Sequence, residues 1–378
     1  MKYNLNDIAV ITSSKRIFAN EYKSSGIPFY RGKEITQLYN HKAFSDLLYI
    51  SEDKYNELTK NFGVPQENDI LITAVGTIGS LYLVNKDDKF YFKDGNLIWI
   101  KNIDKTLAIP KYLYYLLSTD ETQSLIDSIT IGSTQTALTI EGVKMLNLDF
   151  PELKVQQHIV DTIGSVDDLI EKYEEIITKN LNFIKTKFDI MCTQNTTKTL
   201  LKYMCKKAIC GTTPSTKKPE LWNGKIPFIT TPDMANSTFV FSTERCVTET
   251  DKITNRLIDS SSISVSCIGT IGVIGMATEK SLTNQQINTV IPFDNQMFYL
   301  YNLLIKNTEK IKSMATGSAT PNISKEEFLK LELDKCDDKN IYKFNSIASN
   351  LYKNIKGLEK KIILLKKEKE ILLKKYFG

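Results

Sequence analysis

The sequence predicts an α+β fold, in which two similar mixed α/β globules are separated by two long antiparallel coiled-coil helices with pseudo-two-fold symmetry. The first observation is that four motifs occur twice in the same order. The second is that each half ends in a long polar stretch with apolar residues in three- and four-residue steps. The third is the length of 378 residues, which is enough for more than one core. We expect a first globule over 1–152, a first long helix over 153–192, a second globule over 193–336 and a second long helix over 337–378.

The four repeated motifs keep their order while their displacement drifts slowly. Ile-Pro-Phe recurs after 199 residues, GTIG after 193, Tyr-Leu-Tyr after 187 and a Gly-Ser motif after 185. The pairs are "GIPFYRGKEI" (26–35) with "KIPFITTPDM" (225–234), "GTIG" at 76–79 and 269–272, "YLYYLLST" (112–119) with "YLYNLLIK" (299–306), and "GSTQTALTIEGVKMLNLDF" (132–150) with "GSATPNISKEEFLKLELDK" (317–335). Such self-similarity indicates a tandem duplication with a half-length near 190 residues.

Each half contains the same expected elements. The Ile-Pro-Phe segment predicts a short strand followed by a polar turn. The stretch "DILITAVGTIGSLYLV" (69–84) predicts two strands around a glycine turn, because its residues favour strands on both sides. The stretch 109–129 predicts one helix that starts after Pro110.

The two terminal helices carry narrow apolar stripes that form a coiled-coil seam with a small stutter at Leu181. In the first helix the seam contains Ile159, Ile163, Val166, Ile170, Tyr173, Ile177, Leu181, Ile184, Phe188 and Met191. In the second it contains Phe344, Ile347, Leu351, Ile355, Leu358, Ile362, Leu365, Leu372 and Tyr376, with Lys369 at one seam position.

A narrow apolar stripe needs a partner in water. The helices could each pack on their own globule, but their similar length and period favour packing on each other. The first helix delivers the chain to the second globule, and the second must run back along it. We therefore expect an antiparallel pair that holds the globules apart and brings the chain ends near each other.

The glycine turns do not match nucleotide-binding motifs. Neither GTIG copy is followed by the Gly-Lys of a P-loop, and both are followed by strand-like sequence, whereas a dinucleotide motif opens a helix. A tight β connection that uses positive φ explains them better. Thr73, Thr77 and Thr270 could still contact a ligand from such a turn.

Composition sets broad limits on function. The net charge of +5 permits a nucleic-acid partner without demanding one. No apolar run is long enough for a membrane span, so we expect a cytoplasmic protein with no membrane partner. The six cysteines form no C-x-x-C pair, and two histidines are too few for most imidazole metal centres. We expect no catalytic, cofactor-binding or metal-binding residues in this chain.

Taken together, the motifs resemble the specificity subunit of type I restriction–modification systems. The resemblance is carried by "IPFYRGKEI", "DILITAVGTIGSLYLV", "GSTQTALTIEGVKMLNLDFPELKVQQHIV" and their second-half counterparts, and it covers essentially the whole chain. The segment "FPELKVQQ" (150–157) is similar to the family's entry into the first spacer helix. The second half departs from it, because "LDKCDDKN" (333–340) lacks the proline and the glutamines.

The resemblance implies that the globules are target recognition domains and that the helices are spacers that also dock partner subunits. The implied partners are double-stranded DNA, two modification (methyltransferase) subunits and the restriction (nuclease–translocase) subunits. It further implies that S-adenosylmethionine, ATP and Mg²⁺ act in those partner subunits. This chain would read an asymmetric bipartite site, with one half-site for each domain.

Polar residues near the repeated motifs are the candidates for DNA contact. Arg31 and Lys33 follow the first Ile-Pro-Phe strand and suit guanine edges or phosphates, although a solvated turn is an equal alternative. The remaining candidates are Asn96 in the first globule and Thr230, Thr231, Asp233, Asn284, Gln285 and Gln286 in the second. The amides of 284–286 suit adenine, although at least one of them is expected only to satisfy backbone groups. Asp233 suits a cytosine amino group unless it only forms a turn.

Two other functions remain open on the sequence. The first is a coiled-coil adapter whose globules bind protein without DNA specificity. The second is an enzyme with an unrecognised nucleotide site at the glycine turns.

Overall fold

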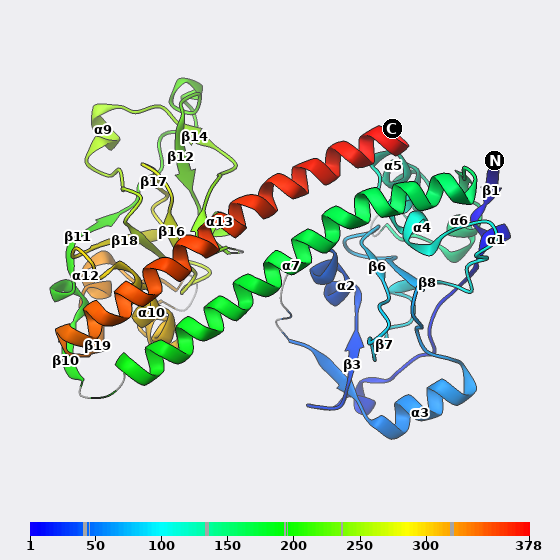
Figure 1. The fold of residues 1–378 in the computed structure, drawn as a ribbon, viewed down its shortest axis with the longest axis horizontal. Coiled ribbons are helices and arrows are strands. Elements are labelled where there is room, and N and C mark those ends of the chain that lie inside the picture. The colour runs from blue at the N-terminus through cyan, green and yellow to red at the C-terminus, as the bar shows by residue number, and fades with distance from the viewer. Residues whose placement is uncertain are drawn as a thin grey trace. The chain divides into compact units, whose positions relative to one another are not determined.

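The computed structural model describes residues 1–40, 44, 46–132, 136–192, 194, 196–235, 237–317 and 321–378. It divides into two compact units. Unit 1 comprises Met1–Asp168 and Lys366–Gly378, and unit 2 comprises Leu169–Leu365. Each unit therefore contains one globule and a part of both long helices, α7 (Leu153–Cys192) and α13 (Asp338–Phe377) (Figure 1).

Unit 1 is a mixed α/β globule with three small sheets. Their strand orders are β2-β8-β5-β6, β4-β3-β7 and β1-β9. All neighbouring strands are antiparallel except β3 and β7, which are parallel. The strands are β1 (Lys2–Asn4), β2 (Val10–Thr12), β3 (Ile27–Tyr30), β4 (Leu48–Ile50), β5 (Ile70–Thr73), β6 (Leu81–Leu83), β7 (Tyr91–Phe92), β8 (Leu97–Lys101) and β9 (Asn147–Asp149).

Unit 2 repeats this topology strand for strand. Its sheets have the orders β11-β18-β15-β16-β13, β14-β12-β17 and β10-β19, and β12 and β17 are again parallel. Among the described residues, β13 is the strand that unit 2 adds, and it pairs parallel with β16. The strands are β10 (Thr197–Leu200), β11 (Cys205–Cys210), β12 (Ile226–Ile229), β13 (Phe239–Val240), β14 (Cys246–Val247), β15 (Ile263–Ser266), β16 (Ile274–Ala277), β17 (Leu282–Thr283), β18 (Ile287–Pro292) and β19 (Glu332–Lys335). The expected duplicated α/β architecture is confirmed.

Five of the short helices correspond between the units, and a 3₁₀ helix over Leu201–Tyr203 takes the place of α1 in unit 2. Unit 1 has α1 (Leu5–Ile8), α2 (Gly32–Tyr39), α3 (Glu52–Asn61), α4 (Pro110–Leu117), α5 (Asp120–Ser128) and α6 (Ile140–Lys144). Unit 2 has α8 (Thr231–Met234), α9 (Asp251–Thr254), α10 (Met297–Lys306), α11 (Thr308–Ser313) and α12 (Lys325–Phe328). The single helix expected over 109–129 is wrong, because Thr119 interrupts it. The Thr119 hydroxyl donates to the carbonyl of Leu116 and accepts from the amide of Thr122, which caps α5.

Within unit 1, the beginning of α7 pairs with the end of α13. The rings of His158 and Tyr376 lie 6.1 Å apart, centroid to centroid. Further along α7, Asp167 Oδ1 lies 2.7 Å from Lys369 Nζ. The residue number rises on one helix as it falls on the other, so the two helices are antiparallel here. Phe377 also contacts Tyr112, which in turn contacts Phe150 beside the N-terminal amine.

Within unit 2, the end of α7 pairs with the beginning of α13 in the same sense. Lys361 Nζ lies 5.5 Å from the ring centroid of Tyr173, and the rings of Phe188 and Phe344 lie 5.2 Å apart. The antiparallel pairing expected for the two long helices is therefore present in each unit.

The seam residues of both helices are buried or partly buried, but α13 buries a second stripe. The buried seam residues are Ile159, Ile163, Val166, Ile170, Ile184, Phe188, Phe344, Ile355, Leu358 and Ile362, and the partly buried ones are Tyr173, Ile177, Leu181, Met191, Ile347, Leu351, Leu365, Leu372 and Tyr376. Ile341, Ala348 and Tyr352 are more buried than Ile347 and Leu351 and belong to the core of unit 2. In unit 2, α13 thus packs on its own globule as well as on α7, and both of the packing arrangements considered above occur together.

A buried amide on a long helix anchors the aromatic helix of each globule. Gln156 of α7 is fully buried, and its Oε1 accepts a hydrogen bond of 2.9 Å from the amide of Ile109, just before α4. Asn345 of α13 accepts hydrogen bonds from the amides of Phe298 and Tyr299 at the start of α10. The second half lacks the sequence of the "FPELKVQQ" junction but keeps this contact.

Neither long helix, nor any other helix in the described part of the chain, has an apolar run sufficient to cross a bilayer.

Candidate nucleic-acid interface

Three connections of unit 1 meet at one edge of its sheets. They are the start of α2, the GTIG turn between β5 and β6, and the loop between β7 and β8. The amide of Ala74 donates to the carbonyl of Asn96 over 2.8 Å, and a Cβ added to Gly32 would lie 3.7 Å from the carbonyl oxygen of Val75. Because β3 and β7 are parallel, their carboxyl ends meet at this edge. We call residues 31–33, 74–79 and 94–96 the loop edge of unit 1.

The equivalent connections of unit 2 meet in the same way. The amide of Cys267 donates to the carbonyl of Gln286 over 2.7 Å, and the amide of Asn284 donates to the carbonyl of Ile229 over 3.0 Å. A Cβ added to Gly269 would lie 4.0 Å from Gln286 Nε2. We call residues 230–233, 267–272 and 284–286 the loop edge of unit 2. The structure thus brings the sequence-predicted residues of each half together at one edge.

A buried hydroxyl closes each GTIG turn. Thr73 Oγ1 donates to the carbonyl of Thr77 over 2.5 Å and accepts from the amide of Ser80 over 2.9 Å. Ser266 Oγ makes the same two hydrogen bonds, with the carbonyl of Thr270 and the amide of Val273. The turn therefore has the same internal construction in both units.

Two of the candidate threonines cannot reach DNA from their positions. The side chain of Thr73 is fully buried and its hydroxyl is used within the turn, so the expectation of a ligand contact from Thr73 is corrected. Thr231, the first residue of α8, is also buried, so the expectation of a DNA contact from it is corrected as well. Thr77 and Thr270, by contrast, are exposed at the tips of their turns.

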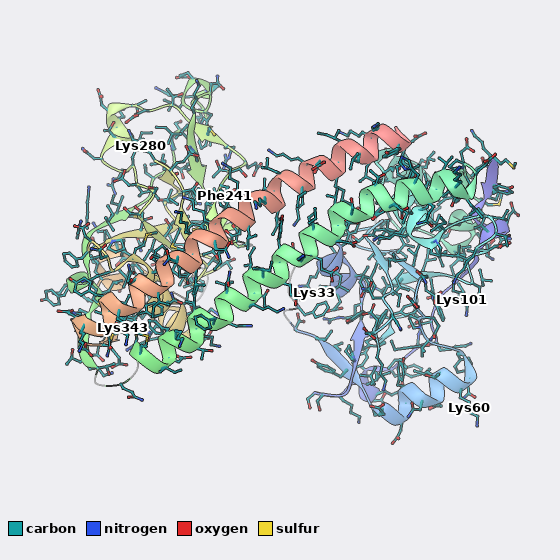
Figure 2. The ribbon with its side chains drawn as sticks, viewed as in Figure 1. Lys33, Lys60, Lys101, Phe241, Lys280 and Lys343 are labelled. Carbon is teal, nitrogen blue, oxygen red and sulfur yellow. The ribbon has the colours of Figure 1, made fainter. Side chains whose placement is uncertain are left out.

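The two basic candidates of unit 1 are held by acidic residues. Arg31 Nε and Nη2 donate to the two carboxylate oxygens of Glu34 over 3.0 and 2.6 Å, and Glu34 is buried. This hydrogen bonding raises the pKa of the Arg31 guanidinium. Lys33 pairs with Asp46 and is exposed, on the side of unit 1 away from Lys101 at the end of β8 (Figure 2). A base or phosphate would have to compete with these carboxylates.

The candidates of unit 2 after β12 form a cap. The backbone amide and the hydroxyl of Thr230 both donate to Asp233 Oδ2, over 2.7 and 2.6 Å. This is the turn-forming role that was the alternative for Asp233 on the sequence. Arg31 and Glu34 occupy the same positions in unit 1, because the amide of Arg31 likewise donates to Glu34.

The amide candidates after β17 bond mainly to one another. Asn284 Nδ2 donates to Gln286 Oε1 over 3.1 Å, and the amide of Gln286 donates to Asn284 Oδ1. Gln285 is exposed and its Oε1 accepts from the hydroxyl of Thr213. In unit 1, Asn96 has the position of Gln286 and is partly exposed.

A further segment at each loop edge escaped the sequence reasoning. In unit 1 it is 13–16, where the hydroxyl of Ser14 donates to the carbonyl of Phe92 and Arg16 pairs with Asp94. In unit 2 it is 212–218, where the amide of Thr212 donates to the carbonyl of Thr283. The signal was present as "TSSKR" (12–16) and "TTPSTKK" (212–218), in which hydroxyl residues precede two cations in both halves.

Other expected features bear on this region only in part. The centre of the Gly-Ser motif, 133–135 and 318–320, lies outside the described residues. Within the described residues, no group of three or more His, Cys, Asp or Glu is placed to hold a metal ion.

Comparisons with known proteins place the chain in a family. The family model for the type I restriction modification DNA specificity domain matches residues 1–182 and 195–362. The chain is 24% identical over 371 residues to the type I restriction enzyme HindI specificity subunit of Haemophilus influenzae, covering 76% of this chain and 81% of that protein. It is 32% identical over 172 residues to a putative type I specificity subunit, S.HindORF215P, of the same organism, covering 45% and 41%. The crystal structure of the type I S subunit from M. genitalium superposes with a TM-score of 0.63 at 16% identity, over 100% of this chain and 96% of that one, and supports the fold. Because the family model covers most of its length, the chain belongs to the type I restriction–modification DNA specificity family, as a specificity subunit for DNA sequence recognition.

Proposed function

We propose that this chain reads an asymmetric, bipartite DNA site, with one half-site at the loop edge of each unit. The observation that carries the proposal is the convergence, in both units, of three polar loops at equivalent positions of the same fold. Polar side chains on such loops can contact base edges and phosphates.

The two loop edges differ in the residues that they present. After the Ile-Pro-Phe strand, unit 1 has Arg31 and Lys33, whereas unit 2 has Thr230 and Asp233. Before the long central strand, unit 1 has Asn96, whereas unit 2 has the 284–286 amides. Because donors and acceptors differ, the two half-sites are expected to differ in sequence.

The long helices supply the spacer in this proposal. Each has 40 residues and is therefore about 60 Å long, which exceeds the roughly 34 Å of one duplex turn. An antiparallel pair of this length would keep two readers at a set separation along one duplex.

We further propose that the outer face of α7 docks a helix of a modification subunit. In unit 2, Leu169, Ile176, Phe183 and Ile190 recur every seven residues on α7. Leu169, Phe183 and Ile190 are 41%, 48% and 62% exposed, while the seam of the same helix is covered. A seven-residue apolar period suits another helix better than a flat surface. Two modification subunits, and restriction subunits after them, are the partners that the family implies.

In this proposal the chain has no catalytic role. The methyl transfer that uses S-adenosylmethionine, and the nuclease–translocase work that uses ATP and Mg²⁺, belong to the partner subunits. Equilibrium dialysis of the isolated chain with ATP or S-adenosylmethionine tests this directly, and saturable binding to the chain would contradict it.

The main experiment maps methylated adenines in cells that express the chain with its modification subunits. We expect a split motif whose two parts change independently when either globule is exchanged. Selection of random duplexes by the purified complex provides the second readout. Stable complex formation without any sequence selection would instead indicate the protein-interaction adapter.

The docking face has its own test. Phe183→Asp and Ile190→Asp are expected to release the modification subunit in co-purification. Lys185→Asp is the matched control, because Lys185 is exposed on the same helix but is not three or four residues away from any member of the docking face. Retention of the modification subunit by both the Phe183→Asp and the Ile190→Asp variant would contradict the proposed docking face.

A further inference from the structure

Backbone conformation and packing account for three of the four residues in each GTIG turn, and the threonine is the exception. The first glycines, Gly76 and Gly269, have φ of 76° and 73°, a conformation that other residues adopt only with strain. The second glycines, Gly79 and Gly272, also have positive φ, and an added Cβ would meet Gln123 in unit 1. The backbone conformation of each turn therefore favours glycine at both positions.

The isoleucines of the turns are explained by packing. Ile78 packs against the main core of unit 1, and Ile271 packs against the main core of unit 2. The threonines are not explained in this way. Thr77 and Thr270 are exposed, and only their carbonyl groups take part in the hydrogen bonds that close the turns.

Both threonines offer two hydrogen-bond donors to the solvent. Within the described part of the chain, neither the hydroxyl nor the backbone amide of Thr77 or Thr270 donates a hydrogen bond. A Cβ added to Gly76 would meet no atom within 4 Å, so the surface beside the threonine of unit 1 is open. An adjacent amide and hydroxyl are the kind of donors that contact phosphate oxygens.

The duplication separates two kinds of DNA contact. If the two units read different half-sites, residues that differ between the loop edges are suited to base recognition. A solvent-facing residue that is identical in both, at equivalent positions, is suited to the part of the duplex that is the same everywhere, which is the phosphate backbone.

We propose that Thr77 and Thr270 each bind a phosphate of the DNA backbone and supply affinity without sequence preference. This inference rests on the proposed function, because it assumes that the loop edges face DNA. It assigns the GTIG turns to positioning and leaves base reading to the loops beside them.

The test uses the assembled complex of the full chain with its modification subunits. Thr77→Ala and Thr270→Ala are compared with wild type for binding to two duplexes, one with the methylated motif and one of scrambled sequence. Each variant is expected to bind both duplexes about tenfold more weakly, as for one lost hydrogen bond to a charged group, and to keep their affinity ratio. Thr77→Ser and Thr270→Ser keep the hydroxyl and are expected to restore binding.

Two control variants accompany the test, and separate outcomes would contradict the phosphate assignment and the proposed function. Thr106→Ala in the loop after β8 and Thr197→Ala in β10 remove exposed threonines away from the loop edges and are expected to leave binding unchanged. Wild-type affinity of both turn variants, or a loss confined to the motif duplex, would overturn the phosphate assignment. Failure of the wild-type complex to prefer the motif duplex would instead overturn the proposed function.

Discussion

Replacing Gln156 by leucine should loosen the attachment of α4 to the long helix α7. The Gln156 side chain makes three hydrogen bonds to the backbone. Its Nε2 donates to the carbonyls of Leu107 and Pro151 over 2.8 and 2.9 Å, and its Oε1 accepts from the amide of Ile109. Leucine has a similar volume, so the substitution removes the hydrogen bonds while leaving little empty space.

The expected size follows from the three backbone groups that lose their partner. An unsatisfied buried polar group costs about 1–3 kcal/mol, and these groups are only partly buried, so the lower end applies to each. The local free energy of opening should fall by about 3 kcal/mol, or roughly 100-fold in the opening equilibrium. Hydrogen exchange read by mass spectrometry, on peptides that cover 107–117, measures this directly.

The neighbouring residue and the second unit provide controls. Gln157→Leu changes an exposed glutamine whose side chain donates to Asp161 within the same helix, and it should leave the exchange unchanged. Asn345→Leu should speed exchange in peptides over 297–306 and leave 107–117 unaffected. Equal protection of 107–117 in the Gln156→Leu variant and wild type would refute the anchoring role.

Three further predictions concern other contacts. Burial raises the pKa of Glu359 above its ordinary 4.5, although two backbone amides of the β13 region donate to its carboxylate. Because the folded chain holds this proton more tightly than the unfolded chain, the free energy of unfolding falls as pH rises from 4.5 through the folded pKa. Glu359→Gln should flatten this pH dependence, measured by urea unfolding between about pH 4 and pH 7. The side chains of Asp167 and Lys369 form an ion pair and are about a quarter exposed. A double-mutant cycle with Asp167→Ala and Lys369→Met should give a coupling free energy of about 1 kcal/mol in unfolding. Additive effects of the two substitutions would contradict a direct interaction. Gly79→Ala should lower the stability of unit 1 by roughly 1–3 kcal/mol, because a φ of 86° is strained for alanine and the new Cβ meets Gln123. Thermal unfolding measures this loss, and an unchanged midpoint would exclude strain at this turn.

The duplication made the fold accessible from the sequence alone. Each repeated motif marks an element that packs at the same place in both units, so the order of the motifs gave the order of the elements. Turn residues with positive φ and buried strand residues leave a clear record, because few amino acids can replace them. The break at Thr119 was missed, since a single capping threonine within an apolar helical pattern is a weak signal.

For the candidate site, the sequence predicted the location of the residues but not their contacts. The spacing of motifs placed Arg31, Asn96 and Thr77 near polar turns, but it could not show that the Arg31 guanidinium is already paired with buried Glu34. Nor could it show that Thr73 points inward. Both contacts are short in sequence, three residues for Arg31 and Glu34 and four for Thr73 and Thr77. The burial of Glu34 and Thr73, by contrast, depends on the packing of the folded unit, which no local pattern records.

The pair Gln156 and Asn345 shows why motif absence is weaker evidence than motif presence. The second half lacks the proline and the glutamines of the "FPELKVQQ" junction. What the fold requires there is an acceptor for the unpaired amides at the start of an aromatic helix, and a long helix can supply it from more than one turn. Asn345 does so from the second turn of α13, whereas Gln156 does so from the first turn of α7. Both units therefore keep an acceptor for these amides, although it comes from different positions of the two long helices. A functional comparison of the two units has to be made between interacting atoms rather than between aligned residues.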